Sequence, residues 1–340
     1  MDGSSLRDVS LDDKYRLGQG RVFISGTQAL VRLPIMQRQR DQANGLDTAG
    51  YISGYRGSPI GGYDNALWAA KTYLENHNIV FQPGLNEDLA ATAIWGTQQL
   101  DFVPGRKVDG VFAIWYGKGP GVDRSGDPLK HLNYNGTHRN GGVLVVFGDD
   151  HAGKSSSIGH QSDQALAANS IPVLFPATIQ EYLDFGLHGI AMSRFASVAV
   201  GFKCVNETVT ATATVAVDLN RVSINLPQGM SVPEGGIHIR PEYDPLGQDE
   251  RMVRYKMPRV LAYARNNRLD RVAFGSPRPT KLGIVASGKA YLDCVGALHQ
   301  LGIDDAKANA LGIGLYKVGM VWPLEPEGLK AFAADCEELL

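Results

Sequence analysis

The stretch Pro83-Gly-Leu-Asn-Glu-Asp-Leu-Ala-Ala-Thr-Ala-Ile-Trp-Gly-Thr-Gln-Gln-Leu100 marks the start of a helix directly after a strand. The strand is the short β-like run Ile79–Phe81, and Asn86 is a favourable N-cap residue. Four residues fall on one face of this helix: Leu89, Ala93, Gly96 and Leu100. The spacing therefore predicts that Glu87 lies in the first helical turn.

Two interpretations of Glu87 follow from this position. An acid in the first turn complements the helix dipole, which is an ordinary way for a helix to begin. In open α/β sheets, however, ligands bind outside the carboxyl ends of the strands, where Glu87 is expected to lie. The local pattern alone favours the dipole role, and the surrounding loops decide between the two.

Composition excludes several classes of protein. The chain has 340 residues, 44% hydrophobic residues and a formal net charge of −2, which suits two or three globular domains and not a nucleic-acid-binding protein. No run approaches 18 apolar residues, and the polar start of the sequence lacks a signal peptide pattern, so no membrane association is expected. The cysteines Cys204, Cys294 and Cys336 are too far apart for an iron–sulfur motif and fit a reducing, cytoplasmic location.

Strands alternate with helices along most of the chain, which predicts an α/β fold with a doubly wound, mostly parallel sheet. The apolar run Val143–Phe147 is typical of a strand buried on both faces. The sequence divides into four parts: a polar lead-in (1–20), an α/β domain (21–224), a proline-rich connector (225–280) and a second α/β unit (281–340).

The second unit is expected to be incomplete. It shows two strand patterns, residues 281–286 and 314–320, and two helix patterns, residues 290–301 and 325–340. So few elements would struggle to close a core of their own. Because the pattern stops inside an expected helix, we expect the chain to be a fragment.

Three polar, glycine-rich loops each follow a predicted strand: 54–62, 116–131 and 148–163. Each has a plain alternative as an ordinary turn or solvated loop. Because they follow parallel strands, all three should lie at one edge of one sheet, and Glu87 should lie at the same edge. The third loop carries ligand types for a metal in Asp149, Asp150, His151, His160 and Asp163, but their spacing matches no known metal loop. Its serines 155–157 with Lys154 suggest a nucleophile, although a flexible polar loop is the better interpretation. No metal site is predicted.

Taken in order, the segments 54–64, 86–87, 117–128 and 148–163 resemble the thiamine-diphosphate pyrimidine-binding domain of 2-oxoacid:ferredoxin oxidoreductases, in particular of the indolepyruvate type. Residues 281–289 and 314–323 resemble the transketolase C-terminal-like domain of the same family. The resemblance covers residues 15–340 and rests on the ordered set of motifs.

The resemblance implies specific roles. Glu87 would be the catalytic glutamate that hydrogen-bonds the aminopyrimidine ring of the cofactor and favours its imino tautomer. Further residues near the cofactor would be Gly57, Ser58 and Gly117. Substrate would contact Arg56, Ser58 and Lys118.

The same resemblance implies what lies elsewhere. Such enzymes bind diphosphate and magnesium through a Gly-Asp-Gly motif and carry clustered cysteines for iron–sulfur clusters, and this sequence has neither. We therefore expect half of a thiamine diphosphate site, inactive alone, in an enzyme that converts an aryl 2-oxoacid such as indolepyruvate to an acyl-CoA and reduces ferredoxin. Magnesium and iron–sulfur clusters would be held by other domains or subunits, and a homodimer is expected.

Two other functions fit the same residues. One is a subunit of a non-oxidative thiamine diphosphate enzyme, such as a transketolase-like or decarboxylase half. The other is a non-catalytic interaction subunit of such a complex.

Overall fold

The computed structural model describes residues 9–151, 153, 158–242, 244–275 and 277–340. Its strands are β1 (Arg21–Ser25), β2 (Thr48–Gly54), β3 (Ile79–Phe81), β4 (Gly110–Lys118), β5 (Val143–Asp149), β6 (Val173–Leu174), β7 (Ala199–Val205), β8 (Thr212–Ala216), β9 (Arg271–Phe274), β10 (Thr280–Ser287), β11 (Ile313–Val318), β12 (Met320–Trp322) and β13 (Cys336–Leu339). Its α-helices are α1 (Asp13–Arg16), α2 (Gly26–Ala43), α3 (Tyr63–Ala69), α4 (Lys71–Glu75), α5 (Glu87–Thr97), α6 (Gly119–Arg124), α7 (Gly126–Asn135), α8 (Asp163–Ala168), α9 (Ile179–Ala196), α10 (Asn206–Val209), α11 (Pro245–Arg251), α12 (Met257–Asn266), α13 (Gly288–Gln300), α14 (Asp305–Leu311) and α15 (Pro326–Ala333). A 3₁₀ turn spans Leu100–Phe102, and a π-helix spans Met252–Lys256.

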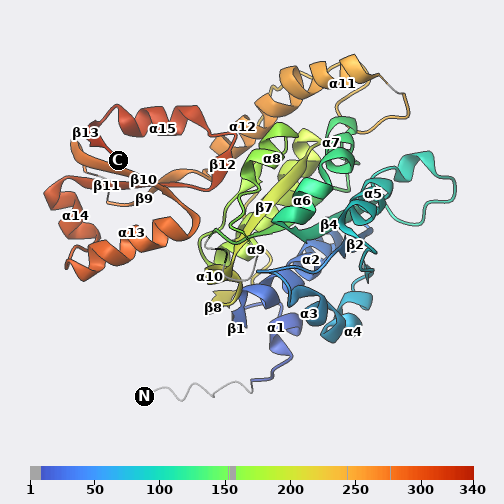
Figure 1. Cartoon of the computed structure of the whole chain (residues 1–340), viewed down its shortest axis with the longest axis horizontal. Helices are drawn as coiled ribbons and strands as arrows, with labels where there is room; N and C mark the ends of the chain where they lie inside the picture. Colours follow the sequence, from blue (N-terminus) through green and yellow to red (C-terminus); the bar gives the residue numbers. More distant parts are fainter. Residues whose placement is uncertain (1–8, 152, 154–157, 243, 276) are drawn as a thin grey trace.

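The largest sheet formed by the described residues has the strand order β12-β6-β7-β5-β4-β2-β3 (Figure 1). Strands β2 to β7 run parallel, and β12 pairs antiparallel with β6. The chain turns outward from β2 to β3 and then returns to place β4 on the other side of β2, so the strand order reverses between β2 and β4. The predicted α/β fold with a doubly wound, mostly parallel sheet is confirmed.

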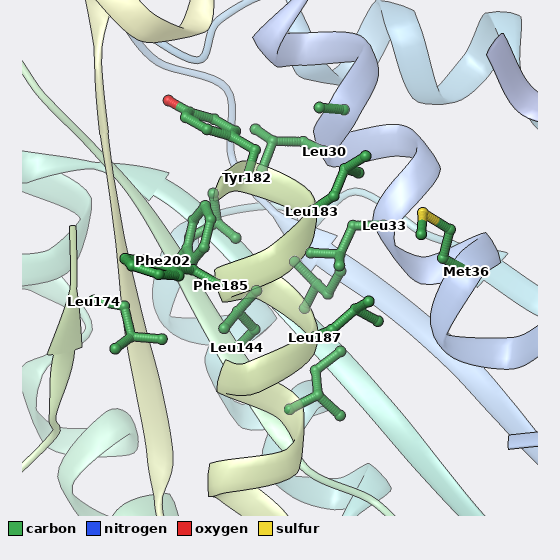
Figure 2. Packing of buried hydrophobic residues seen from close by; sticks show 14 of the residues in the cluster. Leu30, Leu33, Met36, Leu144, Leu174, Tyr182, Leu183, Phe185, Leu187 and Phe202 are labelled. Carbon is green, nitrogen blue, oxygen red and sulfur yellow. The ribbon is translucent and has the colours of Figure 1, made fainter. Parts of the chain in front are cut away.

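Helices cover both faces of this sheet. On one face, α2 packs on β2 and α9 packs on β5 and β7, and the two helices contact each other through leucines that include Leu33, Leu183 and Leu187 (Figure 2). On the other face, α5, α7 and α8 bury small and branched side chains against Val145 and Phe147. No helix in the described ranges combines the length and apolar character needed to cross a bilayer.

The crossing of α2 and α9 depends on a glycine. A Cβ atom on Gly186 of α9 would lie 2.3 Å from Cδ2 of Leu33 on α2, and both leucine methyls lie within 2.7 Å of that position. Because Leu33 is fully buried, its side chain has little room to move away.

We expect Gly186→Ala to lower the free energy of unfolding by about 1–3 kcal/mol through overpacking. Gly96→Ala is the matched control, because Gly96 lies in α5 with no atom within 4 Å of its Cβ position. There the gain in helix propensity should stabilise by about 0.5–1 kcal/mol. Urea unfolding of both variants measures the difference, and equal effects would show that the helix crossing tolerates a methyl group.

The second α/β unit contains a sheet of order β13-β10-β11-β9. Strand β9 lies within residues 225–280, the predicted connector, yet it pairs with β11. The predicted helix over 325–340 is wrong in its second half: α15 ends at Ala333, and residues 336–339 form β13, which pairs parallel with β10. The predicted strand over 314–320 is two strands, β11 and β12.

The two units are joined by sheet pairing and by a buried ion pair. Strand β12 leaves the second unit and extends the large sheet at β6. Lys317 of β11 forms an ion pair with Glu181 of α9, and both side chains are at least nine-tenths buried. The second carboxylate oxygen of Glu181 accepts a hydrogen bond from the Ala177 N–H at 2.8 Å. The second unit, too short to build a large core alone, thus completes its burial against the first.

A buried lysine holds the connector on the first unit. Nζ of Lys256 donates to the carbonyl oxygens of Asn133 at 3.2 Å and Tyr134 at 3.0 Å, at the end of α7. Burial, together with the nearby cations Arg251 and Arg240, lowers the pKa of Lys256 to about 7. The carbonyl groups and the helix dipole favour the charged form but do not offset the loss of solvation.

This pKa predicts how stability depends on pH. Between about pH 7 and the pKa of 10.5 for an unfolded lysine, the unfolded chain binds a proton at Lys256 that the native chain has released. Relative to Lys256→Met, the wild-type chain should therefore gain stability as pH rises through this window, by up to about 1.4 kcal/mol per pH unit. Urea unfolding at pH 6 to 10 measures this; a difference that stays constant with pH contradicts it.

Candidate functional site

The loops that follow β2, β3 and β4 meet at the carboxyl ends of these strands, where the strand order reverses. Gly54 lies opposite Tyr116 in the sheet, and the backbone N–H of Tyr55 donates to the Tyr116 carbonyl at 3.0 Å. The N–H of Gly84 donates to the Gly54 carbonyl at 2.8 Å, which brings the segment after β3 to the same edge. A reversal of strand order of this kind is where open α/β sheets bind ligands.

These loops contact one another through glycines. A Cβ atom on Gly57 would lie 2.6 Å from Cγ of Lys118, so the loop after β2 rests on the aliphatic part of that lysine. A Cβ atom on Gly148, at the end of β5, would lie 2.7 Å from Cδ of Pro59. Such close approaches require the absence of side chains at both positions.

Glu87 begins α5 at this edge. The Asn86 side chain caps the helix by accepting from the Leu89 N–H at 2.9 Å, and the Trp115 indole donates to the Glu87 carbonyl at 2.9 Å. The half-buried Glu87 side chain lies against α6, because a Cβ atom on Gly121 would be 2.7 Å from its Cγ and 2.9 Å from Oε1. Within the described part of the chain, no residue donates a hydrogen bond to the Glu87 carboxylate or forms an ion pair with it.

The neighbouring acid takes the nearby cation instead. Arg124 of α6 forms an ion pair with Asp88, and its hydrogen bond lowers the pKa of that carboxyl. Asp88 therefore serves as the ordinary first-turn acid of α5. This leaves the Glu87 carboxylate available as a hydrogen-bond acceptor.

The predicted face of the α5 helix is not its buried face. Leu89 is 53% exposed and Gly96 is also exposed, whereas Ala90, Ala91 and Ile94 are fully buried against the sheet. The small alanines allow the helix to approach β2 and β4 closely. Leu89 is instead exposed, as are two other apolar residues of the segments at this edge, Leu85 at 87% and Tyr55 at 42%.

The remaining predicted site residues lie at the same edge. Arg56 is exposed, Ser58 and Lys118 are half-buried, and Gly117 is buried beneath the Trp115 ring. Lys118 and Gly57 are in direct contact, whereas Glu87 lies against a later turn of the 118–124 segment.

Hydrogen bonds and ion pairs to Asp149 and Asp123 hold the third predicted loop in place. Both carboxylate oxygens of buried Asp149 accept hydrogen bonds from Ser162, at 2.7 and 2.8 Å, and Nζ of Lys203 lies 3.6 Å from Oδ2. His160 lies against Gly119 and places Nε2 3.1 Å from Asp123. Lys154 and serines 155–157 lie outside the described residues. Among those that are described, no group of three or more His, Cys, Asp or Glu residues could hold a metal ion.

Sequence reasoning did not single out Gly119 and Gly121. Their role appears only when His160 and Glu87, distant in sequence, come to rest on α6. The alternating glycines 117, 119 and 121 were the available signal, because a repeated lack of side chains after a strand indicates close packing on that turn.

Comparison with known proteins gives a consistent result. The family model described as "Indolepyruvate oxidoreductase domain" matches residues 271–340. The indolepyruvate oxidoreductase subunit IorA of Methanothermobacter marburgensis is 25% identical over 98% of this chain and 48% of its own length. The IorA subunit of Pyrococcus abyssi is 27% identical over 97% of this chain and 49% of its own length.

A solved structure is similar in fold. The 2-oxoglutarate:ferredoxin oxidoreductase of Magnetococcus marinus, solved with 2-oxoglutarate, coenzyme A and succinyl-CoA bound, superposes with a TM-score of 0.66. It is 16% identical in sequence, and the match covers 94% of this chain and 57% of that one.

The fold of this chain is therefore similar to that of a 2-oxoglutarate:ferredoxin oxidoreductase. The chain is similar along nearly its whole length to indolepyruvate oxidoreductase subunits, which confirms the resemblance seen in the sequence. The chain spans about half the length of the curated relatives it matches.

We expect Gly121→Ala to displace the Glu87 side chain while preserving the fold. The new methyl group would overlap Cγ and Oε1 of Glu87, and a half-buried side chain can rotate away at small cost. Gly62→Ala is the matched control, with no atom within 4 Å of its Cβ position. Crystal structures of the two variants measure the displacement; an unmoved Glu87 carboxylate in Gly121→Ala contradicts the assigned contact.

Proposed function

We propose that this chain supplies the pyrimidine half of a thiamine diphosphate site. The enzyme would oxidatively decarboxylate an aryl 2-oxoacid such as indolepyruvate, form an acyl-CoA and reduce ferredoxin. The substrate proposal is supported by the names of the relatives, which are indolepyruvate oxidoreductase subunits. The ferredoxin and CoA proposals are supported by the solved protein of similar fold, a 2-oxoglutarate:ferredoxin oxidoreductase with coenzyme A and succinyl-CoA bound.

The observation that carries the proposal is the Glu87 carboxylate. It lies where the strand order reverses, is half-buried, and has no hydrogen-bonding or ion-pairing partner among the described residues, while Asp88 beside it is paired with Arg124. A carboxylate is an acceptor-only group when ionised and gains a donor when protonated, so it can exchange a proton with a ring nitrogen. When bound, the cofactor supplies the electron sink for decarboxylation.

The other residues of this edge suit the substrate end of such a site. Arg56 and Lys118 are cations at the ends of neighbouring strands, suited to the carboxylate of a 2-oxoacid, and the Ser58 hydroxyl can hydrogen-bond its keto oxygen. Gly57 and Gly117 keep the backbone of the two loops free of side chains where the cofactor would lie.

A second module would complete the site. Tyr55, Leu85 and Leu89 are exposed apolar residues on the segments that meet at this edge, which suits a contact surface. That module would hold the diphosphate and magnesium, and further domains or subunits would carry the iron–sulfur clusters. We propose that the assembled enzyme is a homodimer in the cytoplasm. The second module would belong either to the rest of a longer polypeptide or to a partner subunit.

In the assembled enzyme, Glu87→Gln should lower kcat for indolepyruvate by about 100-fold or more, because glutamine keeps the shape but cannot take up a proton. Asp88→Asn is the matched control: it changes the adjacent acid, which is paired with Arg124, and should alter kcat only a few-fold. Steady-state reduction of ferredoxin or a dye measures turnover, and calorimetry measures binding of thiamine diphosphate to each variant.

Three outcomes separate the functions. Unchanged turnover in Glu87→Gln would overturn the catalytic role and favour a non-catalytic interaction subunit. A second outcome combines two results: the wild-type enzyme decarboxylates its substrate but reduces neither ferredoxin nor dye, and Glu87→Gln abolishes the decarboxylation. These results together would favour a non-oxidative thiamine diphosphate enzyme. Equal loss in Asp88→Asn would show that the defect is structural.

A further inference from the structure

A cavity lies at the edge of the large sheet opposite Glu87, near the amino ends of β2 and β5. It encloses about 700 Å³ between the last turns of α2 and α9, the loop before β5 and residues 220–226. Six of its lining residues matter here: Arg40, Arg139, Arg194, Phe195, Val222 and Leu226. We call it the amino-edge cavity, and its volume is that of a typical small-molecule site.

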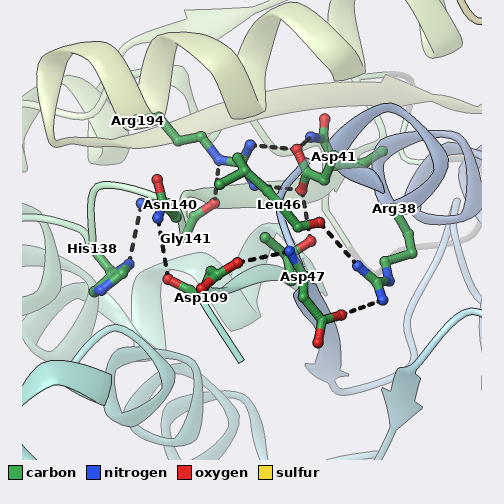
Figure 3. Close-up of polar contacts among 11 residues, drawn as sticks. Arg38, Asp41, Leu46, Asp47, Asp109, His138, Asn140, Gly141 and Arg194 are labelled. Atoms are coloured by element: carbon green, nitrogen blue, oxygen red, sulfur yellow. Dashed lines mark hydrogen bonds and ion pairs between the residues drawn. The ribbon is translucent and has the colours of Figure 1, made fainter. Parts of the chain in front are cut away.

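One of its arginines is already neutralised. Arg194 binds Asp41 through two hydrogen bonds of 2.7 and 2.8 Å, and its Nε donates to the Gly141 carbonyl at 2.8 Å (Figure 3). Asp41 also accepts from the Thr48 hydroxyl at the start of β2, at 2.7 Å. This paired arginine therefore fixes the cavity wall to the sheet and has no free charge to offer a ligand.

The other two arginines lie near acids, Arg40 near Asp41 and Arg139 near Asp101, but do not pair with them directly. Arg40 donates to the Leu219 carbonyl, and neither Arg40 nor Arg139 forms an ion pair with any residue in the described ranges. Burial lowers the pKa of Arg40, which shows that its guanidinium is partly removed from water. Burial outweighs the attraction of Asp41, which is already paired with Arg194, so a bound anion would stabilise this arrangement.

The charge of the cavity selects the kind of anion. Arg40 and Arg194 lie in the last turns of α2 and α9, whose C-terminal dipoles each act as about half a negative charge. After Asp41 and the two dipoles are taken into account, roughly one positive charge is left, because Asp101 near Arg139 is already paired with Arg106. A single carboxylate matches that charge and the fork of a guanidinium better than a phosphate dianion does.

Part of the cavity lining is apolar. Phe195 comes from the end of α9, where Arg259 packs over its ring, and Val222 and Leu226 come from the 220–226 segment. Leu226 is 47% exposed, so its side chain is accessible to a ligand in the cavity. We propose that the amino-edge cavity binds an amphipathic carboxylate, a small molecule with one carboxylate at Arg40 and Arg139 and an apolar body against Phe195, Val222 and Leu226. This site is on the far edge from Glu87 and does not depend on the function proposed there.

The test uses the full-length protein and four probes. 4-Fluorophenylacetate and octanoate represent aromatic and aliphatic carboxylates, benzyl alcohol lacks the charge, and inorganic phosphate lacks the apolar body. Fluorine NMR measures 4-fluorophenylacetate binding directly, and displacement of this probe measures the others. Arg139→Gln should weaken binding of the carboxylates about tenfold or more, since a charged hydrogen bond is lost. The matched control is Arg254→Gln, which alters an exposed arginine that pairs with Glu250 on α11.

Two further variants separate binding from folding. Leu226→Asn should weaken 4-fluorophenylacetate without unfolding the protein, because Leu226 is half exposed. Arg40→Gln keeps a donor for Leu219 and should abolish binding while leaving the melting temperature unchanged or raised, because it removes an uncompensated charge.

Several results would overturn the proposal: no carboxylate binding at millimolar concentration, equal Kd values for wild type and Arg139→Gln, or benzyl alcohol or phosphate displacing the probe as well as octanoate does. A fall in the melting temperature of Arg40→Gln with binding retained would show that Arg40 is only a helix cap. If one carboxylate probe binds at least tenfold more tightly than the other, the site is assigned to that aromatic or aliphatic class.

Discussion

The carboxyl edge of the large sheet depends on contacts that no Cβ atom would permit. Gly57 lies on Lys118, Gly121 on Glu87, Gly119 on His160 and Gly148 on Pro59, each with less than 3 Å available to an added methyl group. These contacts bring loops from different strands within reach of one another without a layer of side chains between them. A site assembled from separate loops needs this closeness, because a ligand must touch several strand ends at once.

The sequence pattern predicted the strands whose residues are all apolar and buried. It failed for strands whose pairing partner lies far away in the sequence. The run Val143–Phe147 is apolar throughout, and it is indeed the fully buried β5. Residues 336–339 continue a helical pattern, yet they become β13 because the edge of β10 offers a strand partner more than 50 residues away. The pattern places Leu89 on the main apolar face of its helix. In the structure, Ala90 and Ala91 fit more closely against the sheet, so the face that carries these alanines is buried and Leu89 is exposed.

The candidate site shows the same division. The order of the loops and the placement of Glu87 at a strand end follow from the sequence, because parallel strands bring their carboxyl ends to one edge. Which of two adjacent acids remains unpaired does not follow, since it depends on where Arg124 of α6 comes to lie. The two edges of the sheet are also opposite in character. Among the residues that the structure describes, Glu87 at the carboxyl edge forms no ion pair with a cation, and Arg40 and Arg139 at the amino edge form none with an acid.

Strand β12 belongs to the first sheet although its sequence comes from the second unit. The border between the two units is therefore not a point at which the gene could be divided or its parts exchanged. A chain ended before Met320 would lose the neighbour of β6, and the uncovered backbone groups of that strand would be open to pairing with another molecule. Recombination with related genes should accordingly preserve the first sheet and this strand as a single inherited block.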